Sequence, residues 1–199
     1  MEYVKVGKKK VFINNGNLYL ERFNIHKIGE IKRLKRISNL KALYLEKNKI
    51  TEIEQLENLV NLEKLHLEAN SIAKINGLES LVNLVELELS GNQISKIENL
   101  DHIPRLKELL LNKNLIKKIE GLDSLINLEH LDLSNNKIEE IDGLENLRNL
   151  KYLNLSYNKL KNIEGLSILP NLEVLELKEN HIDKWDSINK LRNLKKIIK

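Results

Sequence analysis

The chain has 199 residues, of which 41% are hydrophobic, and a formal net charge of +4, so it is too apolar to be intrinsically disordered and long enough to bury a core. It contains no cysteine, which excludes disulfides and thiolate metal sites, and no apolar run approaches the roughly 18 residues of a membrane span. The first residues lack the apolar run of a secretory signal, so a cytoplasmic protein is expected, or a nuclear one in a eukaryote.

The positive charge is confined to the two ends of the chain. Residues 1–36 have a charge balance of +7 and residues 184–199 a balance of +5, whereas residues 37–183 have a balance of −8. A basic protein with an acidic body does not have the charge pattern of an ordinary nucleic-acid binder.

Three short strands are predicted near the N-terminus, at Tyr3–Val6, Val11–Ile13 and Leu18–Leu20, with glycine- or asparagine-containing turns between them. From residue 25 to residue 37 an isoleucine or leucine recurs at every third position. We therefore expect residues 1–39 to form a β-hairpin cap followed by a degenerate repeat.

A 22-residue repeat runs from residue 40 to residue 193, in seven complete copies of L-x-x-L-x-L-x-x-N-x-I-x-x-I-x-x-L-x-x-L-x-x with some exchange of isoleucine and leucine. The L-x-L segment alternates with period two, which predicts a short strand with one buried face. Apolar residues at every third position predict a 3₁₀-like or helical return on the other side. The asparagine column comprises Asn48, Asn70, Asn92, Asn114, Asn136, Asn158 and Asn180.

The asparagine amide carries both a donor and an acceptor, so it can satisfy backbone groups that the turn after each strand leaves unpaired. Glycine precedes the first convex leucine in several repeats, at Gly77, Gly121, Gly143 and Gly165, which predicts a tight turn with positive φ. Residues 194–199 begin a partial terminal repeat, and Trp185 occupies a core column of the last full one. We expect residues 1–199 to form a single domain.

The 22-residue unit resembles the leucine-rich-repeat subclass of the nuclear regulatory subunit of protein phosphatase 1 and of bacterial internalins. The resemblance covers about residues 40–197. It implies an α/β leucine-rich-repeat solenoid, a right-handed curved superhelix with a parallel sheet on the concave face and short 3₁₀ or helical segments on the convex face. These families bind protein partners on the concave sheet, so the resemblance also implies a binding role and a scaffold or regulatory subunit.

Side-chain parity places repeat positions 3, 5 and 7 on the concave surface. These 21 positions carry seven acids and two lysines, which predicts an acidic inner face and a protein partner with a basic contact surface. The candidate partner-binding residues are Tyr44, His66, Glu86, Glu88, Glu108, Leu110, His130, Asp132, Tyr152, Asn154 and Glu176.

In the phosphatase regulator, acidic and aromatic residues alternate along position 5. Here Glu88, Leu110 and Asp132 keep an acidic–apolar–acidic order, but Asn154 stands where a further aromatic residue is expected. A phosphatase regulatory subunit is therefore an alternative to a more general interaction module.

Two other interpretations of the concave columns, an acid/base site and a metal site, have less support than partner binding. Glu86, Glu108, His130 and Tyr152 form one column that could be an acid/base site with raised carboxylate pKa values, or a ladder of solvated side chains. An open groove without an evident nucleophile or oxyanion hole favours the ladder, so no enzyme is expected.

His66 and His130 lie three repeats apart, about 14 Å by the strand spacing, and cannot share a metal ion. No cofactor, metal or small-molecule substrate is expected.

Basic clusters at Lys8–Lys10 and at residues 32–36 give a further alternative, contact with RNA or an anionic surface. Aromatic residues make up only 4% of the chain, so platforms for base stacking are scarce. We favour a solvated basic cap, no nucleic-acid partner and a monomeric state.

Overall fold

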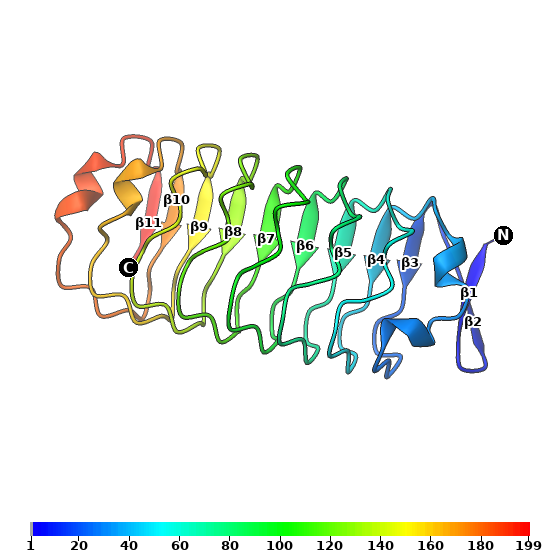
Figure 1. The fold of residues 1–199 in the computed structure, drawn as a ribbon. Coiled ribbons are helices and arrows are strands. Elements are labelled where there is room, and N and C mark those ends of the chain that lie inside the picture. The colour runs from blue at the N-terminus through cyan, green and yellow to red at the C-terminus, as the bar shows by residue number, and fades with distance from the viewer. Residues whose placement is uncertain (1) are drawn as a thin grey trace.

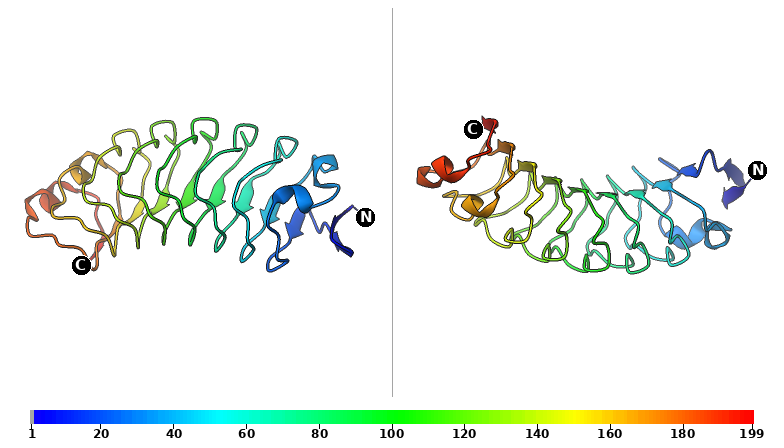
Figure 2. Two further views of the ribbon diagram at one scale, coloured as in Figure 1. Left: turned by 60° about the horizontal axis from the view of Figure 1, so that its bottom comes forward. Right: turned by 90° about the horizontal axis from the view of Figure 1, so that it is seen from above.

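A parallel sheet of nine strands runs along the arc-shaped molecule from the N-terminal hairpin to the C-terminal end (Figure 1). The structure, a computed structural model, describes residues 2–199. The strands of this sheet are β3 (Asn17–Tyr19), β4 (Ala42–Tyr44), β5 (Lys64–His66), β6 (Glu86–Glu88), β7 (Glu108–Leu110), β8 (His130–Asp132), β9 (Tyr152–Asn154), β10 (Val174–Glu176) and β11 (Lys196–Ile198). They line the concave side, and the return segments form the convex side (Figure 2). The predicted solenoid is confirmed.

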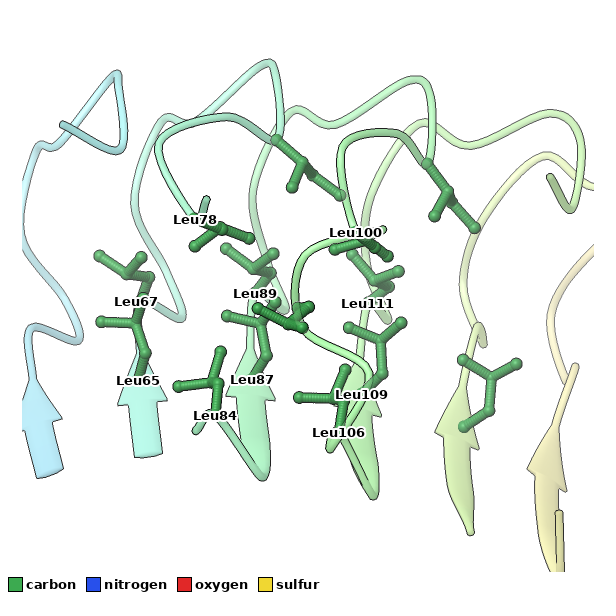
Figure 3. Packing of buried hydrophobic residues seen from close by; sticks show 14 of the residues in the cluster. Leu65, Leu67, Leu78, Leu84, Leu87, Leu89, Leu100, Leu106, Leu109 and Leu111 are labelled. Atoms are coloured by element: carbon green, nitrogen blue, oxygen red, sulfur yellow. The ribbon is translucent and has the colours of Figure 1, made fainter. Parts of the chain in front are cut away.

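The repeat period fixes the strand register. Leu43 pairs with Leu65, and Leu65 with Leu87, so equivalent leucines of successive repeats stack behind the sheet. These leucines are fully buried. Figure 3 shows Leu65 and Leu87 in the core together with Leu78 and Leu100 of the convex side. Because a single repeat cannot enclose its own apolar face, the stacking of neighbours creates the core.

The convex side has little regular helix. The spacing of three produces isolated turns of the 3₁₀ type in the middle repeats; for example, the Leu59 amide donates to the Leu56 carbonyl and the Leu62 amide to the Leu59 carbonyl, both at 2.9 Å. Regular 3₁₀ segments are found towards the two ends, as η1 (Ile28–Glu30), η2 (Leu34–Arg36), η3 (Leu166–Ile168) and η4 (Asp186–Lys190). In the middle repeats two isolated turns precede the next strand.

The asparagine column does what its chemistry predicts. The Asn114 side-chain amide donates to the carbonyls of Leu89 and Leu111, and its Oδ1 accepts from the Ile94 amide, all at 3.0 Å. Each asparagine therefore ties its own strand end to the preceding repeat and satisfies buried backbone groups there.

A second asparagine column was not anticipated. It occupies the last position of most repeats and is mostly exposed; the Asn127 Nδ2, for instance, donates to the Pro104 carbonyl of the preceding repeat at 2.9 Å. Arg105 replaces asparagine in one repeat and donates to Asn83 Oδ1 at 2.6 Å. The signal was present in the sequence as a further residue type that recurs with the period of the repeat.

The predicted glycine turn is present. Gly121 has φ +67°, and a Cβ added there would lie 2.5 Å from the Ile97 carbonyl oxygen, so both conformation and space favour glycine.

The N-terminal hairpin consists of β1 (Tyr3–Val6) and β2 (Lys9–Phe12), paired antiparallel. Its second strand starts earlier than predicted because Val6 pairs directly with Lys9 around a tight turn. Backbone hydrogen bonds between Lys5 and Lys32, at 3.0 and 2.8 Å, join the hairpin to the first turn of the solenoid. At the other end, Trp185 is partly buried against the core, with the Lys199 Nζ 4.2 Å from its ring centroid.

Candidate functional site

Strand register brings the predicted site residues together on one continuous surface. Position 5 forms a row from Tyr44 in β4 to Glu176 in β10, and position 3 forms a parallel row that includes Glu86, Glu108, His130 and Tyr152. All of the candidate residues are partly buried except Glu88, which is buried. The middle of the position 5 row runs through His66, Glu88, Leu110, Asp132 and Asn154.

An aromatic cluster lies at the N-terminal end of this surface. Tyr19 and Tyr44 stack with their ring centroids 4.7 Å apart and 5° between their planes, and the His66 ring meets Tyr44 edge-on at 4.8 Å. Tyr19 was missed from the candidate list because Leu18–Leu20 is separated from the next L-x-L segment by more than one repeat period. The shared L-x-L pattern is the signal that could have found it.

His66 connects two carboxylates. Its Nε2 lies 2.7 Å from Glu86 Oε1 and its Nδ1 lies 3.4 Å from Glu46 Oε1, while Lys64 Nζ lies 2.5 Å from Glu86 Oε2. Burial alone would lower the pKa of His66, but its hydrogen bonds to Glu46 and Glu86 outweigh burial and raise it.

Glu86 shows the opposite balance. Burial would raise its pKa, but the hydrogen bonds from Lys64 and His66 hold the pKa below its ordinary value. An acid/base site in this column would require raised carboxylate pKa values, but the pKa of Glu86 is lowered, because Lys64 and His66 stabilise the charged form.

The C-terminal half of the surface has its own network. The rings of His130 and Tyr152 stack at 4.1 Å, and the Tyr152 hydroxyl donates to Glu176 Oε1 at 3.0 Å. Burial and the Glu176 carboxylate raise the pKa of Tyr152. Asp132 accepts the Ser134 amide at 2.8 Å, and the Asn154 Nδ2 lies 3.4 Å from its other oxygen.

Glu88 is the most buried of the candidates, with 7% of its surface exposed. Its Oε1 accepts the Ser90 amide at 2.7 Å. Burial raises the pKa of Glu88 and the nearby Glu68 adds to this, although the Ser90 hydrogen bonds act in the other direction. The charged form of Glu88 is therefore disfavoured in the folded protein.

Glu88→Gln is expected to stabilise the fold at neutral and alkaline pH. Because the folded-state pKa lies above the unfolded-state value, ionised Glu88 costs stability above the folded-state pKa, and the cost disappears as the pH falls towards the unfolded-state value. Glutamine keeps an oxygen for the Ser90 amide. Urea unfolding should show a higher free energy of unfolding for Glu88→Gln than for the wild type at pH 8, and a smaller difference at pH 4.

Glu129→Gln is the matched control, because lysine hydrogen bonds lower the pKa of Glu129 instead of raising it. This variant should lose up to about 1 kcal/mol at pH 8, as exposed ion pairs do. A loss of stability at pH 8 in both variants would refute the assignment of Glu88 as a destabilising charge.

A ladder of ion pairs borders the concave surface at the second position of the repeat, just before each strand. Lys41 pairs with Glu63 at 2.5 Å, Glu129 with Lys107 at 3.0 Å and with Lys151 at 2.6 Å, and Lys195 with Glu173 at 2.9 Å. We call the side chains of this ladder the rim. The rim acids are thus neutralised by lysines of neighbouring repeats, whereas the inner acids are mostly not.

Among the side chains that the structure describes, no group of three or more His, Asp or Glu is arranged to hold a metal ion. In the same part of the chain, no helix is both long and apolar enough to cross a membrane. The concave surface carries aromatic contacts at Tyr19, Tyr44 and His66 on its N-terminal side and at His130 and Tyr152 on its C-terminal side.

The comparisons with known proteins agree with this architecture. A family model described as leucine-rich repeats (2 copies) matches residues 38–80, 60–102, 82–124, 104–146 and 126–168. Internalin C2 from Listeria monocytogenes is similar, with a TM-score of 0.84 and 30% identity over 92% of this chain and 79% of that one. No curated protein matches the sequence at a significant level.

Two other solved structures are similar over only part of their length. An internalin from Listeria monocytogenes gives a TM-score of 0.79 and 27% identity over 87% of this chain and 51% of that one. TLR13, solved in complex with ssRNA13, gives 0.72 and 30% over 81% of this chain and 25% of that one. The chain thus spans about half of the first protein and a quarter of the second.

Proposed function

Because the chain belongs to the leucine-rich-repeat family, we propose that it is a protein-interaction module, acting as a scaffold or regulatory subunit, whose partner binds the concave face of the sheet. The family supports an interaction module in general terms. The surface and the chemistry of the partner are argued from the side chains.

One observation carries the proposal, the contrast between the two sets of acids. Rim acids such as Glu63 and Glu173 are paired with lysines, whereas Glu88 and Asp132 on the concave face have no lysine or arginine within ion-pair distance among the described residues. Negative charge left in a concave surface attracts and orients a basic partner surface. The aromatic side chains of the concave surface supply apolar contact area of the kind that anchors interfaces.

An affinity pull-down from host lysate tests the proposal. The wild type is compared with Glu88→Gln/Asp132→Asn, which removes two charges while preserving shape, and bound proteins are identified by mass spectrometry. We expect a partner that the double variant loses. Glu63→Gln/Glu173→Gln removes two charges from the rim and should retain it.

An identical partner set for the wild type and Glu88→Gln/Asp132→Asn would reject the concave face as the binding surface. A phosphatase catalytic subunit among the lost proteins would favour the alternative of a phosphatase regulatory subunit.

The second candidate, contact with RNA or an anionic surface through the basic ends, rests on the +7 balance of residues 1–36. Some of that charge serves the cap itself, since the Arg33 guanidinium lies 4.0 Å above the Tyr3 ring centroid and the Lys10 Nζ 5.0 Å from it. Nuclease treatment of the same lysate separates the two candidates, because it should remove partners held through RNA and spare those held on the concave face.

A further inference from the structure

Carboxylates occupy alternate strands along the position 5 row. They are Glu88 in β6, Asp132 in β8 and Glu176 in β10, with Leu110 and Asn154 between them. Neighbouring strands lie about 4.8 Å apart, so the backbone positions of successive members of this row are about 9.6 Å apart. We call Glu88, Asp132 and Glu176 the acidic row.

No lysine, arginine or histidine forms an ion pair with the acidic row in the part of the chain that the structure describes. Its members are nevertheless held in place by neutral donors, the Ser90 amide on Glu88, the Ser134 amide on Asp132 and the Tyr152 hydroxyl on Glu176. Glu88 is more than nine-tenths buried, with 7% of its surface exposed. A buried carboxylate without a counter-ion is costly, so its presence in a concave surface points to a cation supplied from outside.

The spacing of the row selects the conformation of the ligand. A polyproline II helix has three residues per turn and a rise of about 3.1 Å, so every third side chain projects from the same face, about 9.3 Å from the last. Three such cations span about 18.6 Å, close to the span of about 19.2 Å across the acidic row.

Other regular conformations fit less well. In a β-strand, residues three apart point to opposite faces, and same-face neighbours lie only about 6.7 Å apart. In an α-helix, residues seven apart share a face at about 10.5 Å, so three of them span about 21 Å and the third falls out of register.

We propose that the acidic row binds an extended segment of a protein partner in the polyproline II conformation, with a basic residue at every third position, lying across strands β6 to β10. This inference rests on the proposed function and specifies its partner. Arginine suits the row better than lysine, because its planar guanidinium can donate two parallel hydrogen bonds to one carboxylate.

Two labelled peptides of identical composition test the spacing by fluorescence anisotropy at about 0.15 M salt, where long-range attraction is largely screened. The first, Arg-Pro-Pro-Arg-Pro-Pro-Arg, places its arginines three residues apart; the second, Arg-Pro-Arg-Pro-Arg-Pro-Pro, places them two apart. We expect the first to bind the wild-type protein about tenfold more tightly, the equivalent of one well-formed charge-assisted contact.

Asp132→Asn should weaken binding of the first peptide by about tenfold, because it removes the central charge of the row. Glu129→Gln removes a rim charge that already pairs with Lys107 and Lys151, and should change the affinity by less than about threefold. Circular dichroism of both variants verifies that the fold is kept.

The outcomes separate this inference from the proposed function. Equal affinity for the two peptides, both weakened by Asp132→Asn, would overturn the spacing and leave the concave face as the binding surface. Peptide binding that does not respond to Asp132→Asn would overturn both. If neither peptide binds, the polyproline II ligand is rejected, and the lysate pull-down alone decides the proposed function.

Discussion

Asn114→Ala is expected to lower the free energy of unfolding by about 3–6 kcal/mol, because several buried backbone groups lose their hydrogen-bond partners together. These groups are the carbonyls of Leu89 and Leu111 and the amide of Ile94. Asn114 is only 6% exposed, so water cannot easily replace its amide, and each unsatisfied buried group costs about 1–3 kcal/mol. Urea unfolding followed by circular dichroism measures the loss.

Asn127→Ala is the control, since it removes one exposed hydrogen bond, to the Pro104 carbonyl. It should cost no more than about 1 kcal/mol. Equal losses in the two variants would mean that the buried column does not satisfy the backbone in the way described above. Because solenoid repeats contact only their neighbours, hydrogen exchange in Asn114→Ala should increase most in the repeats on either side of the substitution.

The fold follows from the sequence because its determinants are local and periodic. An L-x-L segment specifies a strand with one buried face, and the constant period of the repeat specifies which leucines meet, as Leu65 meets Leu87. The asparagine column could be predicted for the same reason, since its amides satisfy the backbone groups that each turn leaves without a hydrogen-bond partner. The return segments were predicted less well, because a spacing of three is compatible with a 3₁₀ helix and with a pair of single turns.

The sequence predicted which residues lie on the concave surface, but it could not predict their ion pairs or the directions of their pKa shifts. Parity put Glu86 and Glu88 on the same face of one strand, and register put His66 beside them. The pKa of Glu86 is lowered and that of Glu88 is raised. These opposite directions depend on how deeply each carboxylate is buried and on whether the Lys64 ammonium reaches it, and both are set by side-chain packing. The ion pairs of the rim depend on rotamers in the same way.

The similarity to internalins and TLR13 identifies the fold but does not identify the partner, for a physical reason. A repeat of this length restricts the residue types that face the core and the turns, because neighbouring repeats must bury a shared apolar core. The side chains at positions 3, 5 and 7 are free to differ between proteins that share the fold. The partner must therefore be inferred from the side chains at those positions, such as those of the acidic row.

Val4→Asp is the other substitution from which we expect a large effect, a loss of about 3–5 kcal/mol. Val4 in β1 is fully buried against the first turns of the solenoid. Aspartate would forfeit about 1.5–3 kcal/mol of apolar burial and would add the cost of an unpaired buried charge. Urea unfolding gives the stability, and light scattering after size-exclusion chromatography gives the mass.

Lys5→Asp introduces the same residue one position away, where the side chain is exposed, and should change the stability by no more than about 0.5 kcal/mol. In Val4→Asp the loosened hairpin should also uncover β3, the terminal strand of the nine-stranded sheet. An unprotected edge strand pairs readily with other chains, so this variant alone should form higher-mass species. A monomeric Val4→Asp protein with wild-type stability would show that the hairpin does not cap the solenoid. Loss of stability with self-association would show that the hairpin both completes the core and closes the edge of the sheet.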